Sequence, residues 1–308
     1  MSAPAVARIA VTPRSLSADG HPALAELEAA GFELVYPAPG RMPTADEQRA
    51  ALADCVGYLA GVEPITGDIL DRAPRLRVIS RNGVGTDAVD LAAAAERGIT
   101  VTTTGDANAQ GVAELTLALI LASGRAIPAQ DAALRQGEWR RRRGRELAGR
   151  TLGVIGCGRI GSRVAALGRA LGMRVLRHDA APGAGDTPLP RLLAESDVLT
   201  LHCPPPAGGP LVDAAFLDAV RPGACLVNTA RATLIDPRAV RAALDDGRLG
   251  GYATDVFEVE PPADRDLLAH PLAVSTPHIG GFTEESVDRA TRAAVDNLLQ
   301  ALSGARDG

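Results

Sequence analysis

Residues 151–161, TLGVIGCGRIG, constrain the fold of this chain more than any other stretch. The apolar run Leu152–Ile155 is typical of a strand buried on both faces of a parallel sheet. Gly156, Gly158 and Gly161 follow with the spacing G-x-G-x-x-G, and a helical pattern of apolar residues begins directly afterwards. The first glycine of such a turn permits the tight bend, the second lets backbone approach a pyrophosphate, and the third lets helix pack close to strand. The stretch predicts the dinucleotide-binding turn of a Rossmann unit, whose helix N-terminus offers N–H groups to the phosphates.

Asp179 identifies the dinucleotide. It follows the second predicted strand, residues 174–176, at about the spacing at which such units place an acid. A carboxylate there accepts hydrogen bonds from the ribose hydroxyls of NAD and repels the 2′-phosphate of NADP. A glycine-rich turn without a ligand is the alternative, and the acid at this position favours an NAD site over it.

Composition limits the remaining choices. With 308 residues and 46% hydrophobic content, the chain is long enough for two domains with sizeable cores. The net charge of −5 argues against a general binder of nucleic acid or of acidic membranes. Cys55, Cys157, Cys203 and Cys225 are scattered, which indicates free thiols in a reducing compartment. We expect a soluble, cytoplasmic protein without a metal site, because the N-terminus lacks the layout of a signal peptide and no apolar run reaches the length of a membrane span.

The first hundred residues alternate short apolar strands with helical stretches, which predicts a second parallel sheet covered on both faces. No glycine fingerprint follows its first strand. The loop Arg81–Asp87, RNGVGTD, comes directly after a strand. Ligands bind at the carboxyl ends of parallel strands, and the two glycines would let successive N–H groups converge on an anion. A plain strand-to-helix connection is the alternative.

Residues 108–122 form a strongly apolar helical segment, apolar on more than one side, which predicts burial at a domain junction or a subunit interface. The densest charge run of the chain, Arg140–Arg145, comes after it, behind Trp139. This run reads either as a solvated linker or as a place from which one arginine, such as Arg141, reaches an anionic substrate in this or a neighbouring subunit. The lack of interleaved aromatic residues disfavours nucleic-acid binding.

Three polar residues fall at or just beyond strand ends in the cofactor half: Arg231, Glu260 and His278. Arginine presents a planar fork to a carboxylate. Histidine can give a proton to a carbonyl oxygen as a hydride arrives and take it back in reverse. A carboxylate bonded to the other ring nitrogen fixes the tautomer and favours the imidazolium. Together they suit hydride transfer to a 2-oxo acid, although an arginine after a strand is often a surface residue and Glu260 before two prolines could be plain loop.

Nearly the whole chain resembles the D-isomer-specific 2-hydroxyacid dehydrogenases, the family that includes phosphoglycerate, formate and glyoxylate/hydroxypyruvate dehydrogenases. The matching stretches are Arg81–Asp87, Val112–Glu114, Gly156–Gly161, Asn228–Asp236, Asp255–Pro262 and Thr276–Gly281. The resemblance implies Arg231 as the substrate-binding arginine, Glu260 as the partner acid and His278 as the acid/base. It implies further cofactor contacts from Arg159, Ile160, Asp179, Cys203, Thr229, Arg231, Asp255, His278 and Gly281. Substrate contacts are expected from Arg81, Asn82, Gly83, Val84, Arg231 and His278.

The resemblance also implies an α/β fold of two doubly wound parallel-sheet domains, a Rossmann cofactor domain and a flavodoxin-like substrate domain. We expect residues 1–101 as the first piece of the substrate domain, 102–282 as the NAD-binding domain, and 283–308 as a helix that returns to the substrate domain. Family members are commonly dimers through the cofactor domain, and a homodimer is expected here.

The expected reaction moves a hydride between NAD(H) and a small 2-oxo acid or D-2-hydroxy acid. Ala232 replaces the glycine that usually follows the arginine, a change we expect to be tolerated. Phosphoglycerate dehydrogenases that resemble this chain tend to carry a basic residue near Gly61 and often a regulatory domain, which weakens the case for a serine-pathway role. Glu63 would disfavour a second negative charge if it faced the cleft. Two alternatives stay open: an oxidoreductase for a phosphonate or other anion, and a non-catalytic NAD-sensing protein of the corepressor type.

Overall fold

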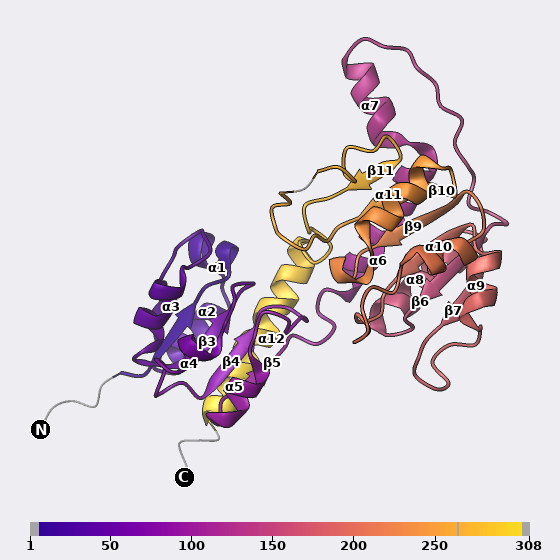
Figure 1. Ribbon diagram of the computed structural model, residues 1–308. Helices are drawn as coiled ribbons and strands as arrows, with labels where there is room; N and C mark the ends of the chain where they lie inside the picture. The colour runs from indigo at the N-terminus through magenta and orange to yellow at the C-terminus, as the bar shows by residue number, and fades with distance from the viewer. Residues whose placement is uncertain (1–5, 264, 304–308) are drawn as a thin grey trace, which may run out of the picture. The chain divides into compact units, whose positions relative to one another are not determined.

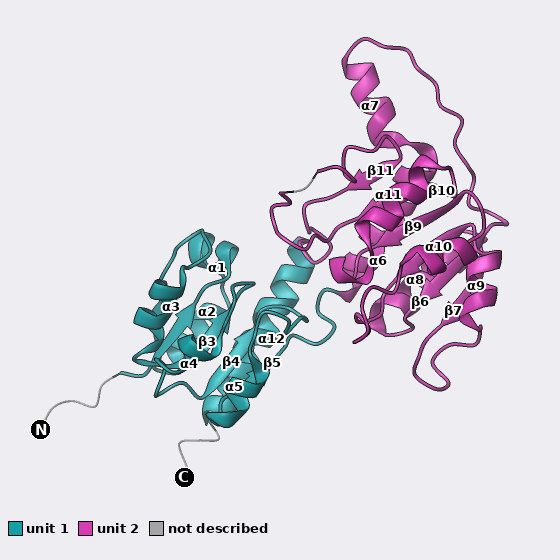
Figure 2. Cartoon of the chain, viewed as in Figure 1, with its two compact units in different colours: residues 1–108, 284–308 teal, residues 109–283 magenta. Residues whose placement is uncertain are grey.

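The structure is a computed structural model that describes residues 6–263 and 265–303. The chain divides into two compact units, which Figure 2 colours separately. Unit 1 comprises Met1–Asn108 and Glu284–Gly308, and unit 2 comprises Ala109–Thr283. The first division falls after Asn108, past the boundary at Val101 that the sequence predicts, and the second lies one residue beyond the predicted Phe282.

Unit 1 is built on a five-stranded parallel sheet of order β2-β1-β3-β4-β5. Its strands are β1 (Arg8–Val11), β2 (Glu33–Val35), β3 (Cys55–Ala60), β4 (Val78–Arg81) and β5 (Thr100–Thr102). This is the flavodoxin-like order predicted for the substrate domain. The register aligns Ile9 with Leu34 and with Gly57, and Ala60 with Arg81, so the carboxyl ends of the central strands meet at one edge.

Six helices cover the two faces of this sheet (Figure 1). They are α1 (Arg14–Asp19), α2 (Leu24–Ala29), α3 (Ala45–Leu52), α4 (Gly67–Leu70), α5 (Leu91–Glu96) and α12 (Glu284–Ser303). A capping box of Thr44 and Glu47 begins α3. One face of the sheet packs on α3, α4 and α5, and α12 lies on the other, where Leu298 and Leu302 are buried against Ile9. The last helix thus belongs to the same core as the first strand.

Unit 2 has a six-stranded parallel sheet of order β11-β10-β9-β8-β6-β7. Its strands are β6 (Thr151–Ile155), β7 (Arg174–His178), β8 (Val198–Leu201), β9 (Ala224–Asn228), β10 (Leu249–Thr254) and β11 (Ala273–Ser275). The chain leaves β6 toward β7 on one side and continues through β8 on the other. This reversal makes the carboxyl ends of β6 and β8 a topological switch point, the place where doubly wound sheets bind ligands.

The helices of unit 2 are α6 (Ala109–Arg125), α7 (Ile127–Arg135), α8 (Arg159–Ala170), α9 (Leu189–Glu195), α10 (Ala214–Ala219) and α11 (Pro237–Asp245). The predicted apolar helix is α6, which packs on α8, β9, β10 and β11 of its own unit. No single helix among the described residues is long and apolar enough to cross a membrane. The pair α6 and α7, bent by 63° at a short break, is long and apolar enough when taken together, but this is weak evidence because residues of α6 such as Val112 and Leu119 are buried within unit 2.

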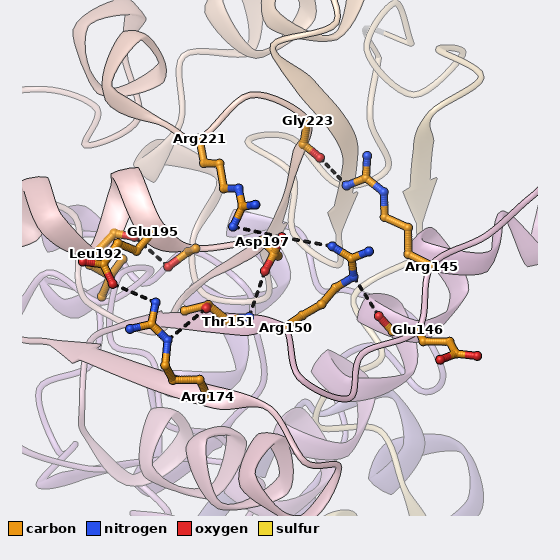
Figure 3. A network of polar contacts seen from close by, with 11 residues as sticks. Arg145, Glu146, Arg150, Thr151, Arg174, Leu192, Glu195, Asp197, Arg221 and Gly223 are labelled. Carbon is orange, nitrogen blue, oxygen red and sulfur yellow. Dashed lines mark hydrogen bonds and ion pairs between the residues drawn. The ribbon is translucent and has the colours of Figure 1, made fainter.

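The amino edge of the unit 2 sheet is tied together by Asp197, whose side chain is 11% exposed (Figure 3). Arg150 and Arg221 reach one of its carboxylate oxygens at 3.1 and 3.4 Å. Arg145 donates from its guanidinium to the carbonyl of Gly223 at 2.6 Å. The last arginine of the charged run therefore holds the segment before β6 against the sheet, which is a structural role.

Candidate active site

The three glycines after β6 have three different environments. A Cβ on Gly156, whose φ is 93°, would lie 2.4 Å from the carbonyl carbon of His202 and 2.5 Å from the nitrogen of Cys203. A Cβ on Gly161 would lie 1.9 Å from the carbonyl oxygen of Gly156. A Cβ on Gly158 would meet nothing within 4 Å. The first glycine therefore serves the tight turn, the third the close approach of α8 to β6, and the second leaves open space at the turn.

Asp179 joins the end of β7 to this glycine turn. Its Oδ2 accepts a hydrogen bond from the backbone N–H of Cys157 at 2.6 Å, and its Oδ1 accepts one from that of Ala181 at 2.8 Å. These two backbone hydrogen bonds lower the pKa of Asp179 below its ordinary value. The carboxylate is thus ionised and fixed beside the position expected for the adenosine ribose.

The start of α8 can receive a pyrophosphate. Gly158 caps the helix, and Arg159 and Ile160 are its first residues. In the part of the chain that the structure describes, no backbone or side-chain acceptor is found for the N–H groups of these three residues. Free N–H groups at a helix start, open space at Gly158 and a fixed acid at Asp179 together fit a dinucleotide.

Two further predicted cofactor residues lie at the ends of the neighbouring strands β8 and β9. Cys203 follows β8 and is half-buried, and burial raises the pKa of its thiol. Thr229 follows β9, is buried, and shares a hydrogen bond of 2.8 Å with Thr116 of α6. The Thr229 hydroxyl therefore ties the end of β9 to α6.

Arg231 lies on the turn between β9 and the short 3-10 helix Ala232–Leu234. Its guanidinium donates to the carbonyl of Ala230 at 2.8 Å. Asn228, fully buried at the end of β9, donates to the Arg231 carbonyl at 2.8 Å and accepts from the Ala230 N–H at 3.0 Å. This asparagine fixes the turn that carries the arginine. The sequence reasoning did not assign it that role, although a polar residue closing a buried strand was a usable signal.

Asp255, after β10, anchors the segment that carries the histidine. It is 2% exposed and accepts hydrogen bonds from the Thr276 hydroxyl at 2.6 Å and from the N–H groups of Ile279 and Gly280, each at 2.8 Å. His278 lies within this segment at a φ of 54°, a conformation that non-glycine residues rarely adopt. Since tertiary contacts on both sides hold that strained conformation, the ring direction is set by the fold. Gly281 follows on the same turn.

His278 and Glu260 form a hydrogen-bonded pair. The distance from Nδ1 to Oε1 is 2.7 Å, and the two side chains are 50% and 41% exposed. Glu260 is therefore more than plain loop: it holds one ring nitrogen and leaves Nε2 for a reacting molecule. Because an ionised carboxylate is only an acceptor, Nδ1 is assigned the hydrogen in this pair.

The other histidines are structural. His202 is half-buried, its Nε2 lies 2.9 Å from the hydroxyl of Thr200, and desolvation lowers its pKa to about 3. His178 uses Nδ1 toward the carbonyl of Thr187 at 3.0 Å. His21 and His270 each lie 3.4 Å from an aspartate, Asp288 and Asp245 respectively.

In unit 1 the loop after β4 has the features of an anion site. The backbone N–H groups of Gly83, Val84 and Gly85 have no acceptor among the described residues. Arg81 is 7% exposed, and its guanidinium donates to the carbonyls of Gly85 at 3.0 Å and Ala60 at 3.4 Å. Arg81 thus stabilises the loop through its hydrogen bonds to backbone carbonyls, and the N–H groups of Gly83, Val84 and Gly85 are left to bind an anion. Asn82 starts the loop by donating its N–H to Ala60 at 2.9 Å.

Comparison with known proteins agrees with these features. Residues 117–280 match the family profile described as D-isomer specific 2-hydroxyacid dehydrogenase, NAD binding domain. D-3-phosphoglycerate dehydrogenase of Methanocaldococcus jannaschii is 39% identical over 271 residues, covering 82% of this chain and 50% of that protein. The chain spans about half the length of the curated relatives it matches.

Solved structures of proteins of similar length have a similar fold. The TT0316 protein of Thermus thermophilus superposes with a TM-score of 0.88 at 39% identity, covering 96% of this chain and 97% of that one. A D-lactate dehydrogenase of Aquifex aeolicus, complexed with NAD and lactic acid, gives 0.82 at 28% identity, with 97% and 96% covered.

The doubly wound sheet, its glycine turn and the fixed acid after β7 define unit 2 as an NAD-binding domain. The chain belongs to the D-isomer specific 2-hydroxyacid dehydrogenase family. The predictions of the family, the two-sheet α/β fold and the cofactor NAD are therefore confirmed.

Proposed function

We propose that this protein interconverts a small 2-oxo acid and the corresponding D-2-hydroxy acid with NAD(H). The observation that carries the proposal is the 2.7 Å pair of His278 and Glu260, held on a turn anchored by Asp255 in an NAD-binding unit. A histidine with one nitrogen held by a carboxylate and the other free is the arrangement that acid–base chemistry needs. A protein that only sensed NAD would not need this pair.

Each residue has a separate task in the proposed reaction. Bound NADH supplies the hydride for the carbonyl carbon of the 2-oxo acid. His278 donates a proton from Nε2 to the carbonyl oxygen, and it takes the proton back when the hydroxy acid is oxidised. Glu260 holds Nδ1 and compensates the charge of the imidazolium. Arg231 presents its guanidinium fork to the substrate carboxylate.

The loop after β4 also offers hydrogen-bond donors that suit the negative charge of the substrate. Three successive N–H groups, those of Gly83, Val84 and Gly85, are available to an anion there. Successive backbone donors in a loop can bind carboxylates and phosphates. The loop therefore supports a small anionic acid as the substrate.

NADH consumption, followed by its absorbance, tests the proposal with a panel of glyoxylate, hydroxypyruvate, phenylpyruvate, phosphonopyruvate and 3-phosphohydroxypyruvate. His278→Asn should lower kcat by roughly a hundred- to ten-thousandfold while NADH still binds. Glu260→Gln should lower kcat by a smaller factor. Arg231→Lys should lower kcat strongly, because the point charge of an ammonium group does not replace the planar fork of the guanidinium. Asp245→Asn removes the carboxylate beside His270 and is the matched control that should leave kcat unchanged. Absence of turnover with every acid would refute the activity, and full activity of His278→Asn would refute the assignment of the acid/base.

We also propose that the protein is a homodimer through unit 2. Helix α7 has no buried residue, and Ile127 and Leu134 on it are 52% and 57% exposed. Trp139 follows the helix with 82% of its surface exposed. Apolar side chains grouped on a projecting element are typical of a protein interface. Light scattering after size exclusion should give twice the chain mass, and Leu134→Glu should reduce it, whereas the exposed Leu91→Glu in unit 1 should not.

The cytoplasm is the proposed location, supported by four free cysteines, two of them buried. Cell fractionation with antibody detection tests this, and recovery of the protein with oxidised cysteines from an extracellular fraction would contradict it.

A further inference from the structure

A cavity of about 500 Å³ lies at the amino edge of the unit 1 sheet, the edge opposite the loop Arg81–Asp87. Residues at the amino ends of the strands line it, together with Leu302 in the last turn of α12. Every lining residue belongs to unit 1, so the cavity is separate from the NAD-binding unit. Its volume lies within the range of small-molecule sites, about 300–1,000 Å³.

Part of the cavity wall is apolar and fixed. Phe32, Leu76 and Leu302 line the cavity and are buried. Phe32 and Leu302 belong to one core cluster, and the lining residues Ala7 and Val56 pack against the same cluster. Because side chains in a close-packed core keep their positions, these residues offer a preformed apolar surface to the body of a small molecule.

The charged part of the wall is entirely basic. It consists of Arg75, Arg77 and Arg97, and no aspartate or glutamate is among the lining residues that the structure describes. Arg97 donates from Nε to the carboxylate of Asp71 at 3.2 Å. Arg77 donates from Nη2 to the carbonyl of Leu302 at 3.5 Å, at the negative end of the α12 dipole. These two arginines therefore already have negative groups beside them.

Arg75 differs from the other two arginines. It is exposed, and it forms no ion pair within residues 6–263 and 265–303. Its guanidinium can therefore bind an anion in the cavity without giving up an acidic partner. The planar fork of an arginine suits the paired oxygens of a carboxylate, a sulfonate or a phosphate.

We infer that this cavity binds a small amphipathic anion, a molecule with one acidic group on an apolar or aromatic body. The body packs against the buried apolar wall, where it is removed from water. The acidic group binds Arg75 and meets no repulsion, because no carboxylate of the described residues lines the cavity. The inference is independent of the proposed reaction, since none of the residues assigned to that reaction lines the cavity.

Two fluorescent probes test the inference on the whole chain: anilinonaphthalene sulfonate, an aromatic anion, and phenylnaphthylamine, its uncharged counterpart. Saturating NAD is present in each titration, so that the dinucleotide site is occupied. The wild type should bind the sulfonate in a saturable manner. Arg75→Glu should weaken that binding by about tenfold or more, because repulsion replaces attraction, and should leave the affinity for the uncharged probe within about twofold. Arg72→Glu makes the same charge change at an exposed arginine that does not line this cavity, and it should change neither affinity by more than about twofold.

Three results would overturn the inference. The first is that the sulfonate does not bind while NAD is present, and the second is that wild type and Arg75→Glu bind it equally well. The third is that Arg72→Glu loses as much affinity as Arg75→Glu, which would mean a diffuse attraction to the surface. Ala7→Trp is an independent arm, because it adds bulk at the apolar wall and should weaken the binding of both probes. Unchanged binding of both probes in a folded Ala7→Trp protein would place them elsewhere and overturn the inference as well.

Discussion

Removing the carboxylate of Asp179 should change which dinucleotide the protein binds. This side chain fixes the end of β7 to the glycine turn through hydrogen bonds of 2.6 and 2.8 Å from two backbone N–H groups. Asp179→Ala removes the charge without adding bulk. Asp186→Ala, which removes an exposed acid from the same loop, is the matched control.

The size of the effect follows from the charge and its surroundings. The two backbone hydrogen bonds lower the pKa of Asp179, so its charge is complete at neutral pH. A doubly charged 2′-phosphate about 5 Å away, at an effective dielectric constant of about 40, is disfavoured by about 3 kcal/mol. Arg177 lies close enough to lower the same pKa and donates to Ala184 at 2.6 Å, so its positive charge reduces the repulsion. A preference for NADH of roughly ten- to a hundredfold remains.

Titration of the folded protein with NADH and NADPH, followed by nicotinamide fluorescence, measures this preference without any substrate. Wild type and Asp186→Ala should favour NADH by that factor. Asp179→Ala should bring the two dissociation constants within a fewfold of each other, mainly by tighter binding of NADPH. Equal affinities in the wild type, or an unchanged ratio in Asp179→Ala, would refute the reasoning.

Three further results are expected. Gly161→Ala should lower Tm and abolish NADH binding, because its Cβ would lie 1.9 Å from the Gly156 oxygen. Gly158→Ala should keep Tm and weaken only NADH binding, since its Cβ enters open space. Calorimetry combined with NADH titration checks both variants. Asp255→Asn should destabilise unit 2 by about 1–3 kcal/mol, because one N–H of the His278 segment would face an amide donor; denaturant unfolding measures it, and an unchanged midpoint would contradict it. The stability that the Asp179 hydrogen bonds provide is present above the unfolded-state pKa and lost as pH falls through the lowered folded-state pKa, so the difference in Tm between wild type and Asp179→Ala should shrink toward acidic pH.

The sequence by itself determined the elements and the cofactor, because those signals are local. Runs such as Leu152–Ile155 are strands since every side chain in them is apolar and the sheet is covered on both faces. The three glycines of the turn act within a single short stretch of chain, and their spacing carries the geometry directly. The pairing of Glu260 with His278 was predicted from the resemblance, and the structure joins the two side chains at 2.7 Å.

Only the tertiary structure decided which polar side chains face inward and what they hold. Asp255 anchors the His278 segment through N–H groups more than twenty residues away in the chain. Glu63 reads in the sequence as an acid in a loop, yet it is buried because Thr12, just after β1, and Tyr58, within β3, converge on it. Arg81, predicted to touch the substrate, is largely buried beneath its own loop. The physical reason is that a hydrogen-bond partner for a buried group comes from whichever strand the sheet order brings beside it, and that order is not encoded in any single local stretch.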